Sequence, residues 1–264
     1  MWDGREPSFA SQSNHATLIH AEAIDGLSDD QQAEIVAFET GIFTAQIFDN
    51  KAHELHAAGA TGGPKALSEQ LSKFFVGVND PFGSNFTSNI FDLFKPWLGV
   101  PGGSREAQDR KSVARGEDVF NTTKINITGV AGLPDMVGFC GTCHDTPNVG
   151  NHSVKAPLNI GIADAGANSP PGLDISDLPV FTLKCDDGQT FVVTDPGRAL
   201  ITGNCADIGK FKGPILRALA ARAPYFHNGS AATLIDVVTF YNQRFGIGLT
   251  AQQKDDLVNF LKTL

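Results

Sequence analysis

The chain has 264 residues, of which 41% are apolar and 19% charged, and its formal net charge is −9. A chain of this size can bury a sizeable core in one large or two small domains, and its acidic balance argues against nucleic-acid binding, which needs a basic surface. No stretch approaches roughly 18 apolar residues, so no membrane span is expected.

The N-terminal part of the chain is predicted to be helical with long loops. Ser28 and Gln31 fit a capping box, and a helix is expected from there to about Phe48. Apolar residues recur at helical spacing along it and give it an amphipathic pattern: Ile35, Phe38, Ile42 and Phe43. Residues 77–103 are rich in Gly, Pro, Asn and Phe and are interpreted as loop and linker, so a domain boundary is placed near residue 104.

The C-terminal part is predicted to contain more regular elements. Residues 104–120 fit a helix that is N-capped by Ser104. The runs PVFTLKC and TFVVTD, joined by Asp186-Asp187-Gly188, fit a small β-hairpin. Three further helices are expected, at about 215–221, 233–244 and 251–263, the last opened by a second capping box at Thr250 and Gln253.

The run FCGTCHD at 139–145 carries the strongest motif of the chain. In a CxxCH motif the two thiols form thioether bonds to a haem, and the histidine ligates its iron. Here these residues are Cys140, Cys143 and His144. A redox CxxC would need a βαβ context, and a zinc site would need a second CxxC motif. The sequence shows neither feature. The motif therefore predicts one covalent haem c.

Covalent haem attachment takes place outside the cytoplasm, so a periplasmic or otherwise exported protein is expected. The remaining cysteines, Cys185 and Cys205, are then expected to form a disulfide. The first residues, MWDGREPSF, do not have the pattern of a signal peptide. The sequence is therefore interpreted as a mature or trimmed form, or as part of a longer protein.

The elements around the motif fit a cytochrome c fold. Gly116 in the helix before the motif would let the amphipathic last helix, with Leu257 and Phe260, cross closely. His144 is expected to donate its other ring nitrogen to a carbonyl, for which Pro147 is the predicted source.

The second axial ligand of the iron is left open by the residues alone. The usual ligand is methionine, but only Met1 and Met136 occur. The remaining candidates are lysines and four residues downstream of the motif: His152, Tyr225, His227 and Tyr241.

Residues 211–264 closely resemble the C-terminal haem domain of the bacterial di-haem cytochrome c peroxidases and their MauG-type relatives. The resemblance rests on KGP at 212–214, LR at 216–217 and APYFHNGS at 223–230. It implies a mainly α chain: a cytochrome c fold with a small β-hairpin and long loops at 104–264, preceded at 1–103 by a helical remnant of a second cytochrome c-like domain without a haem motif.

The start of the chain adds to this resemblance. WDGR at 2–5 looks like the family's motif, whose tryptophan, here Trp2, lies between two haems. Gln12 and Glu22 fall at the family's spacing after it, and Glu22 matches the acid over the peroxidatic haem. The family's first haem motif lies upstream of WDGR, so the sequence is interpreted as a member without its N-terminal haem segment.

The resemblance also implies ligands. The family's second axial ligand lies fourteen residues after the histidine of PYxH and is methionine or tyrosine, which gives Tyr241. An open iron, His227 and His152 remain alternatives. Lys212 and Arg217 would balance the haem propionates. A calcium ion would be held partly by the carbonyls of Arg222 and Pro224, although the family's side-chain ligand before WDGR is replaced here by Met1.

These inferences favour an electron-transfer haem c domain with His144 and Tyr241 on the iron. The alternative is a peroxidase or a MauG-like oxidase, which needs a second haem from a missing segment or partner, or an open iron. A structural role of the haem is a third reading. The expected partners are a small redox protein or a quinol-linked electron donor, and a homodimer is a further expectation from the family.

Overall fold

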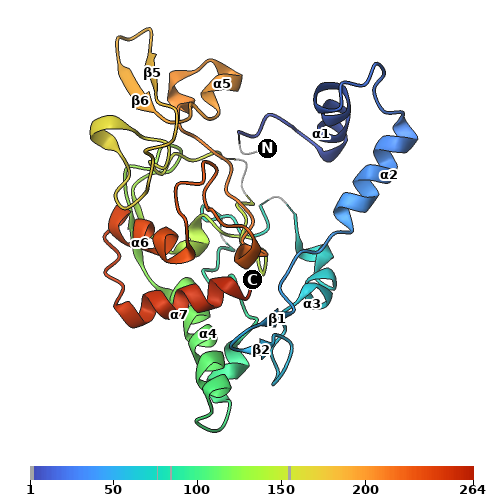
Figure 1. The fold of residues 1–264 in the computed structure, drawn as a ribbon, viewed down its shortest axis with the longest axis vertical. Coiled ribbons are helices and arrows are strands. Elements are labelled where there is room, and N and C mark those ends of the chain that lie inside the picture. The colour runs from blue at the N-terminus through green and yellow to red at the C-terminus, as the bar shows by residue number, and fades with distance from the viewer. Residues whose placement is uncertain (1–2, 76, 84, 154–155) are drawn as a thin grey trace.

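The computed structural model describes residues 3–264 except 76, 84 and 154–155 (Figure 1). The α-helices are α1 (Phe9–His15), α2 (Asp29–Thr40), α3 (Pro64–Ser68), α4 (Arg105–Thr122), α5 (Ala199–Thr202), α6 (Leu234–Arg244) and α7 (Ala251–Lys262). A π-helical turn spans Ala16–His20, and 3-10 turns span Leu71–Lys73, Lys95–Gly99, Cys140–Thr142, Gly166–Asn168, Cys205–Asp207 and Leu219–Ala221. None of the described helices is both long and apolar enough to cross a membrane.

The strands form three separate antiparallel pairs. These are β1 (Phe48–Asp49) with β2 (His53–Glu54), β3 (Ile125–Ile127) with β4 (Met136–Gly138), and β5 (Phe181–Lys184) with β6 (Thr190–Val193). The last pair is the predicted hairpin. The mainly helical character with small hairpins agrees with the expected fold class.

Helices α4 and α7 cross and pack against each other in the lower part of the view in Figure 1. A Cβ added to Gly116 of α4 would lie 2.0 Å from the carbonyl oxygen of Asp256 and 2.6 Å from the Cβ of Phe260, both in α7. The Asp256 carboxylate accepts a 2.5 Å hydrogen bond from Ser112 and also pairs with Arg115. The predicted close crossing at Gly116 is thus confirmed.

The three predicted helix caps are present. Ser104 caps α4, and capping boxes open α2 at Ser28 and α7 at Thr250. Thr233 also caps α6, which was not predicted. The helix predicted at 215–221 is wrong except for its last turn, Leu219–Ala221. Its first half is instead extended along another loop, where the Leu216 amide donates to Val149 at 3.1 Å.

The interpretation of residues 77–103 as a linker is wrong for its second half. Phe91, Phe94 and Trp97 are fully buried in the main core, and Phe91 and Phe94 make edge-on contacts with Phe260 of α7. The main core therefore includes residues from both sides of residue 104. Packing does not follow the predicted boundary, and the division into two domains stays a prediction.

Two polar side chains of α4 allow this irregular segment to be buried. The Glu117 carboxylate accepts from the amides of Leu93 and Phe94, at 2.8 and 2.9 Å. One helical turn later, the Asn121 side chain accepts from the amide of Ile90 at 3.0 Å. Backbone groups that no strand or helix satisfies thus find partners in the core, which is what burial requires.

A Glu117→Gln variant is expected to lose part of the pH dependence of stability. Burial raises the pKa of Glu117 from 4.5 to about 7. The folded state therefore holds this proton more tightly, so the stabilisation is full below pH 4.5 and is lost as the pH rises through 7. A shift of this size corresponds to about 3 kcal/mol.

The measurement is the free energy of unfolding in urea, for the wild type and Glu117→Gln, at several pH values between 4.5 and 7. The two stability curves should diverge, because only the wild-type protein titrates at this position. Glu106 lies on the same helix with its side chain 39% exposed and paired with Arg110, so Glu106→Gln is the control and should follow the wild type. Parallel curves for Glu117→Gln and wild type would contradict the prediction.

The N-terminal helices form an arm beside the main body (Figure 1). Helix α2 ends at Thr40, well before the predicted Phe48, and contributes no buried residue. Phe38 is 71% exposed and Ile42 is 52% exposed. The apolar spacing identified the helix correctly, but the described part of the chain buries none of its apolar side chains completely, and α2 packs mainly on the short α1.

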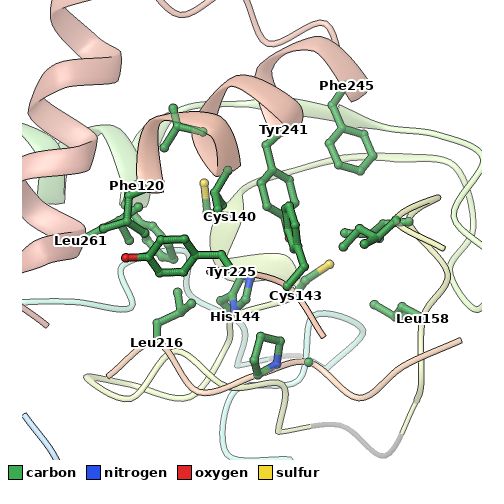
Figure 2. Close-up of a pocket in the computed structure, with 18 of the residues that line it drawn as sticks. Phe120, Cys140, Cys143, His144, Leu158, Leu216, Tyr225, Tyr241, Phe245 and Leu261 are labelled. Atoms are coloured by element: carbon green, nitrogen blue, oxygen red, sulfur yellow. The ribbon is translucent and has the colours of Figure 1, made fainter. Parts of the chain in front are cut away.

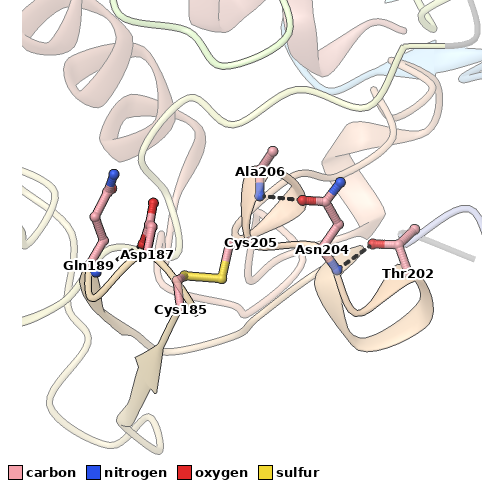
Figure 3. The surroundings of a disulfide bond; sticks show 7 residues. All are labelled: Cys185, Asp187, Gln189, Thr202, Asn204, Cys205 and Ala206. Atoms are coloured by element: carbon pink, nitrogen blue, oxygen red, sulfur yellow. Dashed lines mark hydrogen bonds between the residues drawn. A yellow bond between two sulfur atoms is a disulfide. The ribbon is translucent and has the colours of Figure 1, made fainter.

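The disulfide predicted between Cys185 and Cys205 is present (Figure 3). It joins the β5–β6 hairpin to the 3-10 turn after α5, and the two cysteines pack with Val193 and Ile208 in a small separate core. The bond closes a stretch of 20 residues, which by loop entropy stabilises such a lobe by about 3 kcal/mol.

Candidate functional site

An apolar cavity of about 280 Å³ lies among α4, α6, α7 and the segment 209–227. Figure 2 shows the CxxCH residues on one side of it and Tyr241 reaching in from α6. Most of the lining is aliphatic or aromatic, including Phe120, Leu158, Leu216, Phe245 and Leu261. Such a wall excludes water and lowers the local dielectric constant, which favours a largely apolar guest with few polar contacts.

The CxxCH segment is shaped by a tight turn. The Phe139 amide donates to the Thr142 hydroxyl at 2.9 Å, and the His144 amide donates to the Cys140 carbonyl at 3.0 Å. This turn directs the side chains of Cys140, Cys143 and His144 to the cavity, which all three line.

The two thiols are not activated as a redox pair would be. Burial raises the pKa of Cys140 to about 12 and that of Cys143 to about 12. A redox CxxC instead lowers the pKa of a cysteine to make a thiolate. The environment therefore does not fit a redox pair.

His144 lines the cavity and has one ring nitrogen engaged. Its Nδ1 donates to the Gly150 carbonyl at 2.7 Å, so the predicted acceptor, Pro147, is wrong. The cause is the path of the loop, which turns back through positive φ values at Asn148 and Gly150. Burial lowers the pKa of His144. A neutral ring with a proton on Nδ1 keeps the Nε2 lone pair for a metal.

Tyr241 lies among aromatic rings on the α6 side of the cavity. Its ring centroid is 6.3 Å from that of Phe226 and 6.2 Å from that of Phe245. Burial raises the pKa of Tyr241, with a smaller contribution from the neighbouring cysteines. An unassisted phenolate is therefore disfavoured here, and a nearby cation would have to supply the compensation.

The other candidates for the second axial position are placed differently. Tyr225 lines the cavity (Figure 2), but its hydroxyl donates to the Leu219 carbonyl at 2.8 Å and is engaged there. His227 lines the cavity, stacks on Phe211 at 3.7 Å and has Nε2 3.5 Å from an Asp195 carboxylate oxygen. His152 is buried beside Asp145 and is not part of the cavity lining.

The sequence is similar to known cytochrome-c peroxidases. It is 45% identical over 137 residues to a cytochrome-c peroxidase, IdrP2, of Denitromonas iodatirespirans, covering 48% of this chain and 36% of that protein. It is 32% identical over 146 residues to cytochrome-c peroxidase IdrP1 of the same organism, covering 47% and 36%. The chain is a relative of the bacterial cytochrome c peroxidases. The matched part is thus about a third of these relatives' length.

Other comparisons are weaker. The cytochrome c551 peroxidase of Nitrosomonas europaea is 42% identical over 69 residues, which is 26% of this chain and 21% of that one. No protein-family model matches the chain. Among solved structures, a MauG-like protein associated with microbial copper homeostasis is 27% identical, covering 58% of this chain and 43% of that one with a TM-score of 0.38.

The remaining residues predicted from the resemblance to cytochrome c peroxidases fall into two groups. Lys212, Arg222 and Pro224 line the cavity, whereas Arg217 is buried next to it without lining it. Gln12 in α1 and the exposed Glu22 lie in the N-terminal arm, apart from the cavity lining, and Trp2 lies outside the described residues. In the described ranges, no three His, Cys, Asp or Glu side chains gather as a metal site.

Sequence reasoning missed the part of the cavity wall formed by β3 and the segment around Leu158. Ile125 and Ile127 of β3 line it together with Leu158, which pairs with Phe211 through backbone bonds of 2.9 Å. The alternation of INI at 125–127 was a usable signal for β3. The pairing of Leu158 with Phe211 had no local signal, because the two residues are far apart in the chain.

Proposed function

We propose that the chain is a haem c electron-transfer domain related to the cytochrome c peroxidases, with one haem bound through Cys140 and Cys143. One observation carries this proposal: two thiols, a neutral imidazole and a tyrosine line the same apolar cavity. This donor set fits haem c, which needs two thioethers, an axial imidazole and an apolar surrounding. The names of the relatives point the same way.

Each residue has a distinct role in this proposal. His144 would bind the iron through Nε2, since its Nδ1 is held by Gly150. Tyr241 would be the second protein ligand, and the aromatic wall would keep water away from both. Lys212 and Arg217 would balance the propionates. The bound haem supplies one-electron chemistry, and a site with two strong protein ligands passes electrons more readily than it binds a substrate.

The test is haem content after export. The chain, produced in the periplasm together with a cytochrome c maturation system, should carry one haem that denaturation does not release. The measurements are a pyridine haemochrome spectrum and the intact mass. A Cys140→Ser, Cys143→Ser double variant should lose the covalent haem. A wild-type protein without covalent haem would overturn the proposal.

A second candidate is peroxide reduction or a MauG-like oxidase activity, favoured by the relatives' printed names. It requires a second haem from another segment or partner, and Trp2, Gln12 and Glu22 would then be the catalytic residues. An unchanged ferric spectrum on addition of hydrogen peroxide would argue against this activity at the single haem. We also propose an electron donor, which is a small redox protein or a quinol-linked donor, and a homodimer. A calcium ion would bind to the carbonyls of Arg222 and Pro224.

A further inference from the structure

Arg217 is a cation almost completely enclosed by the protein. Its exposed fraction is 1%. Its Nη2 donates to the Asn148 carbonyl, and its guanidinium carbon is 6.0 Å from the ring centroid of Phe91. Nε and Nη1 have no hydrogen-bond partner in the described part of the chain. Burial lowers the pKa of Arg217 to about 10, so the side chain stays charged at neutral pH.

The loop that Arg217 contacts also holds His144. Three successive carbonyls of this loop are used: Asn148 accepts from Arg217, Val149 accepts from the Leu216 amide at 3.1 Å, and Gly150 accepts from His144 Nδ1 at 2.7 Å. Two neighbouring residues of the loop, Asn148 and Val149, are thereby hydrogen-bonded to the segment 216–217. Displacement of the Asn148 carbonyl would be transmitted to the carbonyl that orients the imidazole, two residues away.

The loop has little freedom to adjust. Gly150 has a φ of +69°, and a Cβ there would lie 2.9 Å from the ring of Phe91 and 3.0 Å from Leu216. Asn148 also has a positive φ, and its side chain donates to Asp92 at 2.6 Å and to Gln70 at 3.0 Å. The contact with Arg217 is therefore made to a rigid support of His144.

We propose that Arg217 is a positioning residue for His144 and that its buried charge raises the reduction potential of the haem. This rests on the proposed function. The ferric state carries one more positive charge than the ferrous state, so a nearby cation in a low-dielectric interior disfavours the ferric state. Pairing with a propionate alone would not require the hydrogen bond to the loop of His144.

Two variants separate charge from geometry. Arg217→Met removes both, whereas Arg217→Lys keeps the charge. Arg110→Met is the matched control: Arg110 is another largely buried arginine, over the Trp97 ring and away from the cavity lining. The readouts are haem content, the midpoint potential from a spectroelectrochemical titration, the ferric electron paramagnetic resonance spectrum and the unfolding temperature.

Arg217→Met should raise the ferric-to-ferrous ratio at a fixed potential at least about tenfold, a downward shift of about 59 mV for one electron. It should also change the low-spin resonance, which reports the orientation of the imidazole. Arg217→Lys should recover most of the potential, and Arg110→Met should leave both properties unchanged.

Three results would overturn the inference. One is an equal potential in Arg217→Met and Arg110→Met, and another is an unchanged resonance in Arg217→Met. The third is loss of haem from both Arg217 variants while Arg110→Met keeps it, which would assign Arg217 to folding. Absence of covalent haem from the wild-type protein would instead contradict the proposed function itself.

Discussion

Replacement of Tyr241 by phenylalanine is expected to change the ferric spectrum of the haem protein from low-spin to high-spin and to raise its reduction potential. A phenolate donates charge and stabilises the ferric state, so its loss favours the ferrous state. Axial ligands tune haem potentials over roughly 0.8 V in total, and we expect a rise on the order of 0.1 V. Phenylalanine keeps the aromatic contacts with Phe226 and Phe245 and leaves the iron open on that side.

The raised pKa of Tyr241 strengthens this expectation. Burial makes the free phenolate costly, so a bound ferric iron would supply the positive charge that compensates for deprotonation. Binding and deprotonation of Tyr241 should therefore occur together and depend on the oxidation state.

Tyr225 provides a matched control for this variant. It lines the same cavity, but its hydroxyl donates to Leu219. Tyr225→Phe should leave the ferric spectrum and potential unchanged. The Tyr241→Phe protein should also gain a spectral response to hydrogen peroxide, since a coordination position is free. If absorption and resonance spectra of Tyr241→Phe match those of the wild type, Tyr241 is not the ligand and His227 becomes the first alternative.

Local signals in the sequence predicted the parts of this protein that depend on neighbouring residues. The caps at Ser28, Ser104 and Thr250 need only a side chain and an amide three residues later, and each was located correctly. The crossing at Gly116 was predictable for a similar reason. A glycine inside an otherwise good helix has a cost, and close approach of a second helix explains why it is tolerated.

Features that depend on the path of the chain could not be read in the same way. The acceptor for His144 is Gly150, because the loop reverses at Asn148. Residues 90–97 have no periodicity, yet they are buried because Glu117 and Asn121 bind their backbone from another element. Periodicity of α2 likewise said nothing about what would cover Phe38. Spacing within a segment reports its own conformation, whereas burial depends on residues distant in the chain.

The crossing of α4 and α7 leads to the second large expected effect. Gly116→Ala should destabilise the protein by at least about 3 kcal/mol, the upper end of the usual cost of overpacking. The new methyl group would lie 2.0 Å from the Asp256 carbonyl oxygen. Backbone cannot rotate away as a side chain can, so α7 would have to move with Phe260. Gly116→Leu should prevent folding and haem attachment altogether.

Helix propensity makes the sign of this result informative. In an exposed helix, alanine in place of glycine stabilises by about 1 kcal/mol, so a large destabilisation can come only from the contact with α7. Gly103→Ala is the control, because nothing lies within 4 Å of a Cβ there, and its stability should match that of the wild type. Urea unfolding followed by far-UV circular dichroism measures the stability of the wild type, Gly116→Ala and Gly103→Ala. A Gly116→Ala protein as stable as the wild type would mean that the two helices do not cross at this glycine. The packing of α4 on α7 described above, which supports the cavity, would then be wrong.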